Sequence, residues 1–523
     1  MGRGGTLNLA GAAVMAVMTL AVTVVLTRHF SKPVVGAFFT ATSLFLIVEA
    51  AASLGAYVGL VNFIARLRSL GQEGRIPVIL RAAIIPVVVV SVMGAALLLM
   101  TAGPLAHLLL SGHLGHAGTS PAVLARAIRA LAFALPFAAL LDTFLGASRG
   151  YRDMLPTVVI DRLGRSSGQL IGVLVAIAAG SVGLLAPLWA VPYVPAAVAG
   201  GLWLRRIRRN HERSQPTAPA GQAKTGSWHS DRWLADATPG GFWRFTAPRA
   251  LATLAQITIQ RIDIVLVAII IGPAEAAVYT AATRFLVLGQ LGNTAISMAA
   301  QPRFAELFAV GNRRGAAQIY QATTAWLILL TWPLYLLTVL YGPEVLSVFG
   351  HSYRAGDTVM VILGCTMLLS SACGQVDMVL ITAGRSSWSL ANGLMAVVIN
   401  VGLDLLLIPR YGITGAAIGW AVAIAVSNLA PLAQLAITFR LHPFGRGTLA
   451  AGALSVLSFG AAPLAVRAIL GSGAGASAAA VGIACLLLVT GLWLFRRALQ
   501  LSVAPGISYF VRRLSRPVQQ AVE

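Results

Sequence analysis

The sequence predicts an all-α, polytopic membrane protein of about 14 transmembrane helices, with two pseudo-symmetric six-helix lobes and a C-terminal helix pair. Of its 523 residues, 58% are hydrophobic and only 10% are charged, whereas soluble proteins carry about 25% charged residues. Long stretches without a charged side chain recur along the chain, and each is long enough to cross a bilayer. The two halves of the chain also resemble each other.

The apolar stretches define the expected helices in order. The first follows Arg3 and imitates a signal peptide, but another apolar stretch follows at once, so we expect a transmembrane helix there. The expected spans are residues 7–27, 36–60, 77–101, 122–146, 155–179, 182–204, 243–271, 275–298, 317–341, 358–383, 388–409, 413–439, 448–470 and 477–495.

The basic residues, which give a net charge of +22, predict the orientation of the chain. They concentrate in alternate connections and in the C-terminal tail. By the positive-inside rule, both termini are therefore expected in the cytoplasm. The sequence has no module that combines aromatic and basic residues, so we expect no nucleic acid as a partner. The basic segments are 66–75, 147–153, 205–242, 302–316, 384–387, 440–447 and 496–523.

One of these segments, 205–242, predicts the domain organisation. It is polar and rich in Pro, Ser and Gly, so it cannot bury enough apolar surface to fold and is expected to be a flexible basic cytoplasmic linker. The linker separates an N-lobe, residues 1–204, from a C-lobe, residues 243–440. A C-terminal helix pair, 441–495, and a basic cytoplasmic tail, 496–523, follow.

An internal repeat relates the two lobes. Residues 39–45 align with 279–285, and residues 65–72 align with 305–312 at the same offset. Each lobe has an even number of expected spans, so the two repeats have the same orientation in the membrane. Parallel repeats related by an axis along the membrane normal are a transporter architecture, with the substrate between the lobes.

Polar residues inside the expected spans are the candidates for function, because a central Arg or Asp costs about 2.5–3.5 kcal/mol to insert. In the seventh span, polar residues recur at spacings of four and three, which places them on one helix face. Arg261 lies on a neighbouring face. The stripe consists of Arg249, Thr253, Gln256, Gln260 and Asp263.

Arginines in other spans extend this pattern and predict a cationic space lined from both halves. Arg162 and Arg165 lie on one face of the fifth span, and Arg284 lies in the eighth. A cationic lining suits an anionic substrate, such as a pyrophosphate or an acidic sugar, because Arg offers forked donors. The candidate substrate-binding residues are Arg162, Arg165, Arg261, Arg284, Gln256 and Gln260.

Four intramembrane carboxylates are candidates to bind a coupling proton or cation, or to orient the arginines. They are Asp263, Asp404, Asp377 and Glu49. The alternative for each charge is a structural ion pair, such as Asp161 with Arg165 or Asp263 with Arg284. The sequence does not choose between these roles.

Enzymatic activity is the weaker hypothesis. The sequence has no GxxxxGK[ST] phosphate loop, and it has no Ser/His/Asp, GxSxG or metal-ligand constellation. We therefore expect neither a catalytic residue nor a bound metal or cofactor.

The order and spacing of several short motifs resemble the polysaccharide flippases, or lipid-linked oligosaccharide translocases. This family belongs to the multidrug/oligosaccharidyl-lipid/polysaccharide exporter superfamily. The chain departs from it at Ser53, where members often have Asp before Leu-Gly. The motifs are residues 36–39, 52–55, 261–263, 276–282, 343–350, 384–385 with Asn392, and 408–417.

The resemblance implies a V-shaped, two-lobed transporter for cell-surface polysaccharide or lipopolysaccharide biosynthesis. It would move a polyprenyl-pyrophosphate-linked oligosaccharide across the bacterial inner membrane by alternating access. Its partners would be this substrate, membrane lipids and polysaccharide assembly enzymes. The alternatives are a lipid II flippase, a cation-coupled multidrug antiporter, and a scaffold that recruits cell-wall enzymes through the linker and tail.

Overall fold

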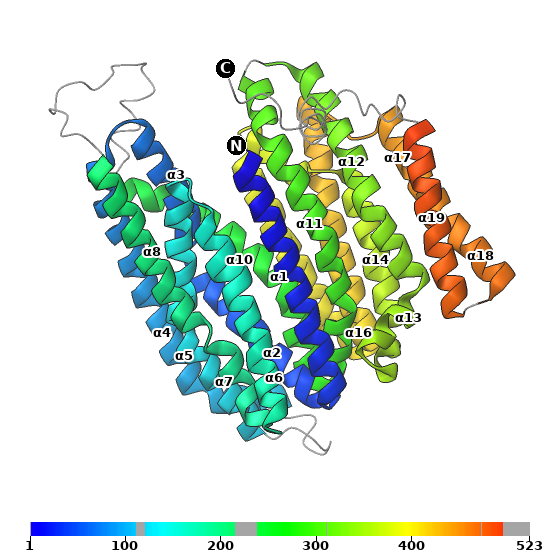
Figure 1. Ribbon diagram of the computed structural model, residues 1–523, viewed down its shortest axis with the longest axis horizontal. Helices are drawn as coiled ribbons and strands as arrows, with labels where there is room; N and C mark the ends of the chain where they lie inside the picture. The colour runs from blue at the N-terminus through cyan, green and yellow to red at the C-terminus, as the bar shows by residue number, and fades with distance from the viewer. Residues whose placement is uncertain (1, 111–120, 215–237, 310, 472, 495–523) are drawn as a thin grey trace, which may run out of the picture. The chain divides into compact units, whose positions relative to one another are not determined.

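The computed structural model describes residues 2–110, 121–214, 238–309, 311–471 and 473–494 (Figure 1). The described residues form helices and contain no strand. Eleven of the described helical stretches are long and apolar enough to cross a membrane. These observations confirm the predicted all-α fold of a multi-pass membrane protein, while the larger number of spans expected from the sequence stays a prediction.

Three features account for the difference in number. The expected span 155–179 is a π-helical segment, η2 (Thr157–Arg165), followed by the short helix α6 (Ser166–Ala178). The expected span 275–298 lies in α11 (Pro273–Ala309), which is rich in polar residues. Neither stretch is among the eleven. The expected spans 388–409 and 413–439 form one helix, α16 (Ser386–Phe439), with a kink at Gly412.

The helices divide into two compact units. Unit 1 comprises residues 1–281, 347–356 and 397–420, and unit 2 comprises residues 282–346, 357–396 and 421–523. The predicted lobe boundaries at 204, 243 and 440 stay predictions. Residues 215–237 of the predicted linker and the predicted tail 496–523 lie outside the described residues.

Unit 1 is built around α5, which packs side by side with α4 and α8 (Figure 1). Buried alanines such as Ala102 and Ala132 occupy this core, and small side chains let membrane helices approach closely. The helices of unit 1 are α1 (Gly2–His29), α2 (Lys32–Ala52), α3 (Ala56–Ser69), η1 (Glu73–Arg75), α4 (Ile76–Leu110), α5 (Pro121–Gly150), η2, α6, η3 (Val182–Leu184), α7 (Leu185–Ala190), α8 (Tyr193–Ser214), α10 (Pro239–Ile270), η4 (Ser347–Phe349) and η5 (His351–Gly356), with parts of α11 and α16.

Unit 2 contains the remaining helices. At its C-terminal end, α17, α18 and α19 lie side by side (Figure 1). Its helices are the remaining parts of α11 and α16 together with α12 (Arg313–Leu340), α13 (Gly342–Leu346), α14 (Asp357–Cys373), α15 (Val376–Thr382), α17 (Arg446–Val456), the π-helical η6 (Leu457–Ala461), α18 (Ala462–Leu470) and α19 (Ala474–Leu494).

Two of the expected spans are broken, which corrects the prediction of continuous helices over 36–60 and 358–383. In unit 1 the chain turns between α2 and α3, where Gly55 has a φ of 61°. A Cβ there would lie 2.8 Å from the Cα of Ala250 on α10, so the turn needs Gly both for its backbone conformation and for close packing. In unit 2, Gly374 with a φ of 73° separates α14 from α15.

Local geometry supports the repeat alignment at one pair of equivalent positions. Gly71 and Gly311 have φ values of 69° and 67°. In both places the residue that follows, Gln72 or Asn312, donates its backbone N–H to a carbonyl five residues earlier. The repeats differ at the break between α2 and α3, because the residue equivalent to Gly55 is Ala295 and α11 continues through it.

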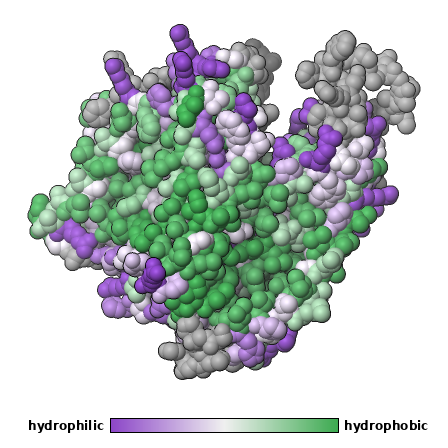
Figure 2. Space-filling model, turned by 180° about the vertical axis from the view of Figure 1, so that it is seen from behind, coloured by the Kyte–Doolittle hydropathy of each residue, from purple (hydrophilic) through white to green (hydrophobic). Residues whose placement is uncertain are grey.

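The surface has the distribution expected of a membrane protein. On the face shown in Figure 2, hydrophobic residues cover most of the middle of the molecule, and hydrophilic residues gather mainly toward the ends of the helices. Such a belt is favourable in lipid and would be unfavourable in water.

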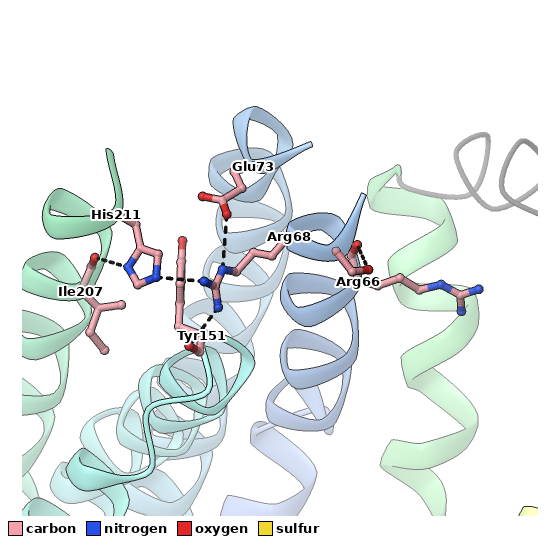
Figure 3. Close-up of polar contacts among 7 residues, drawn as sticks. Arg66, Arg68, Glu73, Tyr151, Ile207 and His211 are labelled. Atoms are coloured by element: carbon pink, nitrogen blue, oxygen red, sulfur yellow. Dashed lines mark hydrogen bonds and ion pairs between the residues drawn. The ribbon is translucent and has the colours of Figure 1, made fainter. Parts of the chain in front are cut away.

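Arg68, at the end of α3, connects three parts of unit 1 (Figure 3). Its guanidinium donates hydrogen bonds to the Tyr151 carbonyl oxygen at 2.9 Å and pairs with Glu73 at 3.3 Å. It also lies 2.9 Å from Nε2 of His211 on α8, whose Nδ1 is 3.0 Å from the Ile207 carbonyl oxygen. This arrangement joins α3, the end of α5 and the last turns of α8.

We predict that Arg68→Ala lowers the free energy of unfolding by about 1–3 kcal/mol, because it removes charged hydrogen bonds that are partly shielded from solvent. Thermal unfolding of the purified protein in detergent measures the effect. Arg66→Ala is the matched control, since Arg66 is exposed on the same helix. Equal melting temperatures for the two variants would contradict this role of Arg68.

Candidate functional site

The centre of the charged site in unit 1 is Arg165, at the end of the π-helical segment η2. Its guanidinium lies 2.6 Å from the Asp161 carboxylate and donates to Oε1 of Gln169 at 3.1 Å. It also lies 3.4 Å from the hydroxyl of Tyr193 and 4.9 Å from the centre of that ring. The ion pair between Asp161 and Arg165, one of the alternatives that the sequence left open, therefore forms within η2, and the contact between Arg165 and Tyr193 attaches η2 to the start of α8.

Two further carboxyl groups adjoin this pair. Glu49 of α2 and Asp142 of α5 are within hydrogen-bonding reach of each other, and both interact electrostatically with Asp161 and Arg165. Oε1 of Glu49 is buried without a hydrogen-bond partner. A hydrogen bond between two carboxyl groups requires that one of them carries the proton. Glu49 and Asp142 can therefore hold a proton inside the membrane.

Tyr57 links this acidic region to α10. Its hydroxyl is within hydrogen-bonding reach of Thr253, and the Arg149 guanidinium lies 5.5 Å from the centre of its ring. Gly146 of α5 allows this approach, since a Cβ there would be 2.6 Å from the Cα of Tyr57. Part of the polar stripe predicted on the seventh span thus faces the α2–α3 break.

The other candidates of unit 1 differ in their surroundings. Arg261 is half-buried on α10 and interacts electrostatically with Tyr193. Within the described part of the chain, no hydrogen bond or ion pair satisfies its guanidinium. Gln256 and Gln260 are exposed on the same helix, and Arg162 is half-buried on η2.

A second polar cluster in unit 1 contains Asp263 and Asp404. The Tyr279 hydroxyl donates to Oδ2 of Asp263 at 2.6 Å, and Nδ2 of Asn400 donates to Oδ2 of Asp404 at 3.1 Å. The two carboxyl groups are also within hydrogen-bonding reach of each other. Asn400 and Asp404 are completely buried, and Asp263 is 3% exposed.

Buried oxygen atoms without a hydrogen-bond partner determine what this cluster can bind. Oδ1 of Asp263, Oδ1 of Asn400 and Oδ1 of Asp404 are all buried and unsatisfied. Gly419 leaves space beside them, because a Cβ there would be 2.4 Å from Oδ1 of Asp404. Carboxylate and amide oxygens are ligands for hard cations, so the cluster can hold a proton or a small cation. Among the described residues, no group of three His, Cys, Asp or Glu side chains could hold a metal ion.

The structure does not bring all the candidate acids together. Glu49 belongs to the Arg165 site, whereas Asp263 and Asp404 form the second cluster. Asp377 lies in unit 2, is exposed, and accepts a hydrogen bond from Ser389. Arg284 also lies in unit 2 and is 8% exposed. The predicted functional roles of all these residues stay predictions.

Sequence reasoning missed Asp142, Arg149, Tyr193 and Tyr279 as parts of these clusters. Asp142 is the one carboxylate within the expected span 122–146, so the rule that selected the other intramembrane charges could have selected it too. The two tyrosines gave no comparable signal, because an isolated Tyr in an apolar helix is usually a packing residue.

These features define a class: a multi-pass membrane protein with clusters of ionisable residues between its helices. Residues 248–406 match the MatE family. No curated protein sequence matches the chain.

Solved structures reveal the fold. The chain is similar to the lipid II flippase MurJ in an inward closed conformation, with a TM-score of 0.69 and 10% identity over 95% of this chain and 99% of that one. It is similar to an inward-facing multidrug resistance MATE family transporter of the MOP superfamily, with a TM-score of 0.61 and 14% identity over 83% and 98%. A MOP superfamily transporter from Pyrococcus furiosus has a TM-score of 0.55 and 17% identity over 84% and 95%. The chain thus shares the fold of these solved structures.

We predict that Asp161 and Arg165 are strongly coupled in stability. Replacing either one by Leu leaves the other charge buried, which costs about 3–5 kcal/mol, whereas the double replacement costs less than the sum of the two. Chemical unfolding of the two single variants and the double variant measures the coupling. Additive losses would show that the contact contributes nothing to stability.

Proposed function

We propose that the protein is a flippase for polyprenyl-pyrophosphate-linked oligosaccharide. It moves this lipid from the cytoplasmic to the periplasmic leaflet of a bacterial inner membrane by alternating access, and it has no enzymatic activity. The product serves cell-surface polysaccharide biosynthesis, with membrane lipids and assembly enzymes as partners. Both termini lie in the cytoplasm.

The observation that carries this proposal is the unpaired guanidinium of Arg261. A half-buried charge without a counter-ion is unfavourable, and an anionic ligand would compensate for it. Arg165, by contrast, already has Asp161 as its counter-ion and acts mainly as a scaffold for the site. Arg162 adds a second cation on η2, and forked Arg donors suit a pyrophosphate.

A lipid II flippase is the second candidate, and the extent of the structural similarity favours it. The match to MurJ covers 95% of the chain, whereas the matches to the MATE structures cover 83–84%. Both candidate substrates are anionic lipids, so both would use Arg261 in the same way. A cation-coupled multidrug antiporter is the third candidate.

The cluster of Asp263, Asn400 and Asp404 is our proposed coupling site. Its three unsatisfied oxygens would bind a proton or a sodium ion, and release of that ion would change the packing of α10 against α16. A transporter can couple two sites only if the ion binds its conformational states with different affinity.

We predict that Arg261→Ala slows flipping of a fluorescent polyprenyl-pyrophosphate-linked oligosaccharide in proteoliposomes by about tenfold or more, as expected when a charged hydrogen bond to the substrate is lost. Arg244→Ala is the matched control, because Arg244 is exposed on the same helix. In cells depleted of the protein, the oligosaccharide-lipid should accumulate on the cytoplasmic leaflet and be cleared by wild type but not by Arg261→Ala. A folded Arg261→Ala variant with the wild-type rate would refute the proposed role.

We also predict that Asp404→Asn removes the dependence of flipping on an imposed ion gradient. Rates in proteoliposomes with a sodium gradient, a pH gradient or neither identify the ion. Glu306→Gln is the control, since its carboxylate is exposed and lies outside the cluster. If Asp404→Asn responds to the gradients as the wild type does, Asp263 and Asp404 are structural and coupling occurs elsewhere.

A further inference from the structure

Unit 2 contains a polar cavity that the proposed mechanism does not use. It is an open cavity of about 120 Å³, which is room for several water molecules or for part of a sugar ring. Helices α11, α12, α14, α15 and α16 line it, and the break at Gly374 is part of its lining. A polar cavity between membrane helices needs a polar occupant, because lipid cannot satisfy its hydrogen-bonding groups.

Neutral amides dominate the polar lining. The side chains of Gln290, Asn293, Gln375 and Asn428 come from three different parts of the unit. Two of them are held together, since Nε2 of Gln375 donates to Oδ1 of Asn293 at 2.5 Å. Similarly, the hydroxyl of Ser370 donates to Oδ1 of Asn428 at 3.2 Å. These bonds fix the orientation of the amides before a ligand arrives.

The charge of the lining restricts the ligand. It contains no Lys or Arg, so nothing in it would compensate for a phosphate or a carboxylate. Its one ionisable acid, Asp377, already accepts a hydrogen bond from Ser389. The lining therefore favours an uncharged ligand over an anion.

Gln290 supplies an amide that is available to a ligand in this cavity. It is half-buried, and its side-chain amide forms no hydrogen bond within the described part of the chain. Next to it, Gly289 makes room for Tyr335, whose hydroxyl would lie 2.0 Å from a Cβ at that position. The cavity thus combines the amide of Gln290 with the neighbouring Tyr335 hydroxyl.

We propose that this cavity binds an uncharged sugar ring through Gln290, Asn428 and Tyr335. The amides and the Tyr335 hydroxyl would donate to and accept from hydroxyl groups, and Met367 would contact the C–H face of the sugar. The identification of this sugar as part of the transported oligosaccharide rests on the proposed function. The binding chemistry itself requires no pyrophosphate and no transport.

The test is saturation-transfer NMR on the full-length protein in a detergent without a sugar head group. The probes are the methyl glycosides of glucose, galactose, mannose and N-acetylglucosamine. We expect at least one to bind, and Gln290→Leu to weaken its affinity about fivefold or more, since a hydrogen bond to the ligand is lost. Ser370→Ala, which removes the hydroxyl that donates to Oδ1 of Asn428, is the second variant and should also weaken binding. Asn62→Leu on α3 is the control, because Asn62 is exposed and bonds only its own helix.

The outcomes separate this inference from the proposed function. Absence of binding by all four glycosides, or equal binding by wild type and a folded Gln290→Leu variant, would overturn it. Binding of tetraphenylphosphonium that is lost in Asp377→Asn, without glycoside binding, would also overturn it in favour of an organic-cation site. Glycoside binding that depends on Gln290 would support it even if the flipping assay failed.

Discussion

The main constraint on this structure is the cost of placing charged groups among apolar helices. Arg165 illustrates how the fold meets it, because Asp161, Gln169 and Tyr193 surround one guanidinium with a counter-ion and hydrogen-bond acceptors. These contacts also fix η2 against α6 and α8. The side chains that lower the cost of burying this charge therefore also determine how η2, α6 and α8 pack.

Local irregularity of the helices is what allows these contacts. The π-helical turn at Thr157–Arg165 and the break at Gly55 both lie near the charged site, where straight helices would direct the side chains differently. Likewise, the break at Gly374 adjoins the polar cavity of unit 2. Non-helical backbone at membrane depth is tolerated only where protein or a water-filled space satisfies it. Here the hydroxyl of Tyr320 donates to the freed carbonyl oxygen of Cys373 at 2.6 Å.

The sequence predicted the helices well, because apolar length alone determines where a chain can cross a bilayer. It also selected Arg165, Arg261, Asp263 and Asp404, since intramembrane charges are rare. The sequence could not predict which side chains these residues contact. Asp263 bonds Tyr279 from α11 and neighbours Asp404 from α16, and these contacts depend on tertiary packing that no spacing along one helix encodes. The break at Gly374 was missed for a similar reason, since Gly is common in membrane helices.

Among the described residues, some buried polar groups have all their hydrogen-bonding partners within the protein, and others do not. We assign structural roles to the first group and binding roles to the second. Arg165 is fully engaged, so its substitution would disturb packing before it disturbed binding. Arg261 has no ion pair in the described part of the chain, and the Oδ1 atoms of Asp263, Asn400 and Asp404 are buried without donors. Arg165 has a counter-ion and hydrogen-bond acceptors within the described part of the protein, whereas these groups do not. We attribute this difference to the binding of a ligand or an ion at these groups. In the function that we propose, an anionic substrate compensates the charge of Arg261, and a bound proton or cation satisfies the oxygen atoms of Asp263, Asn400 and Asp404.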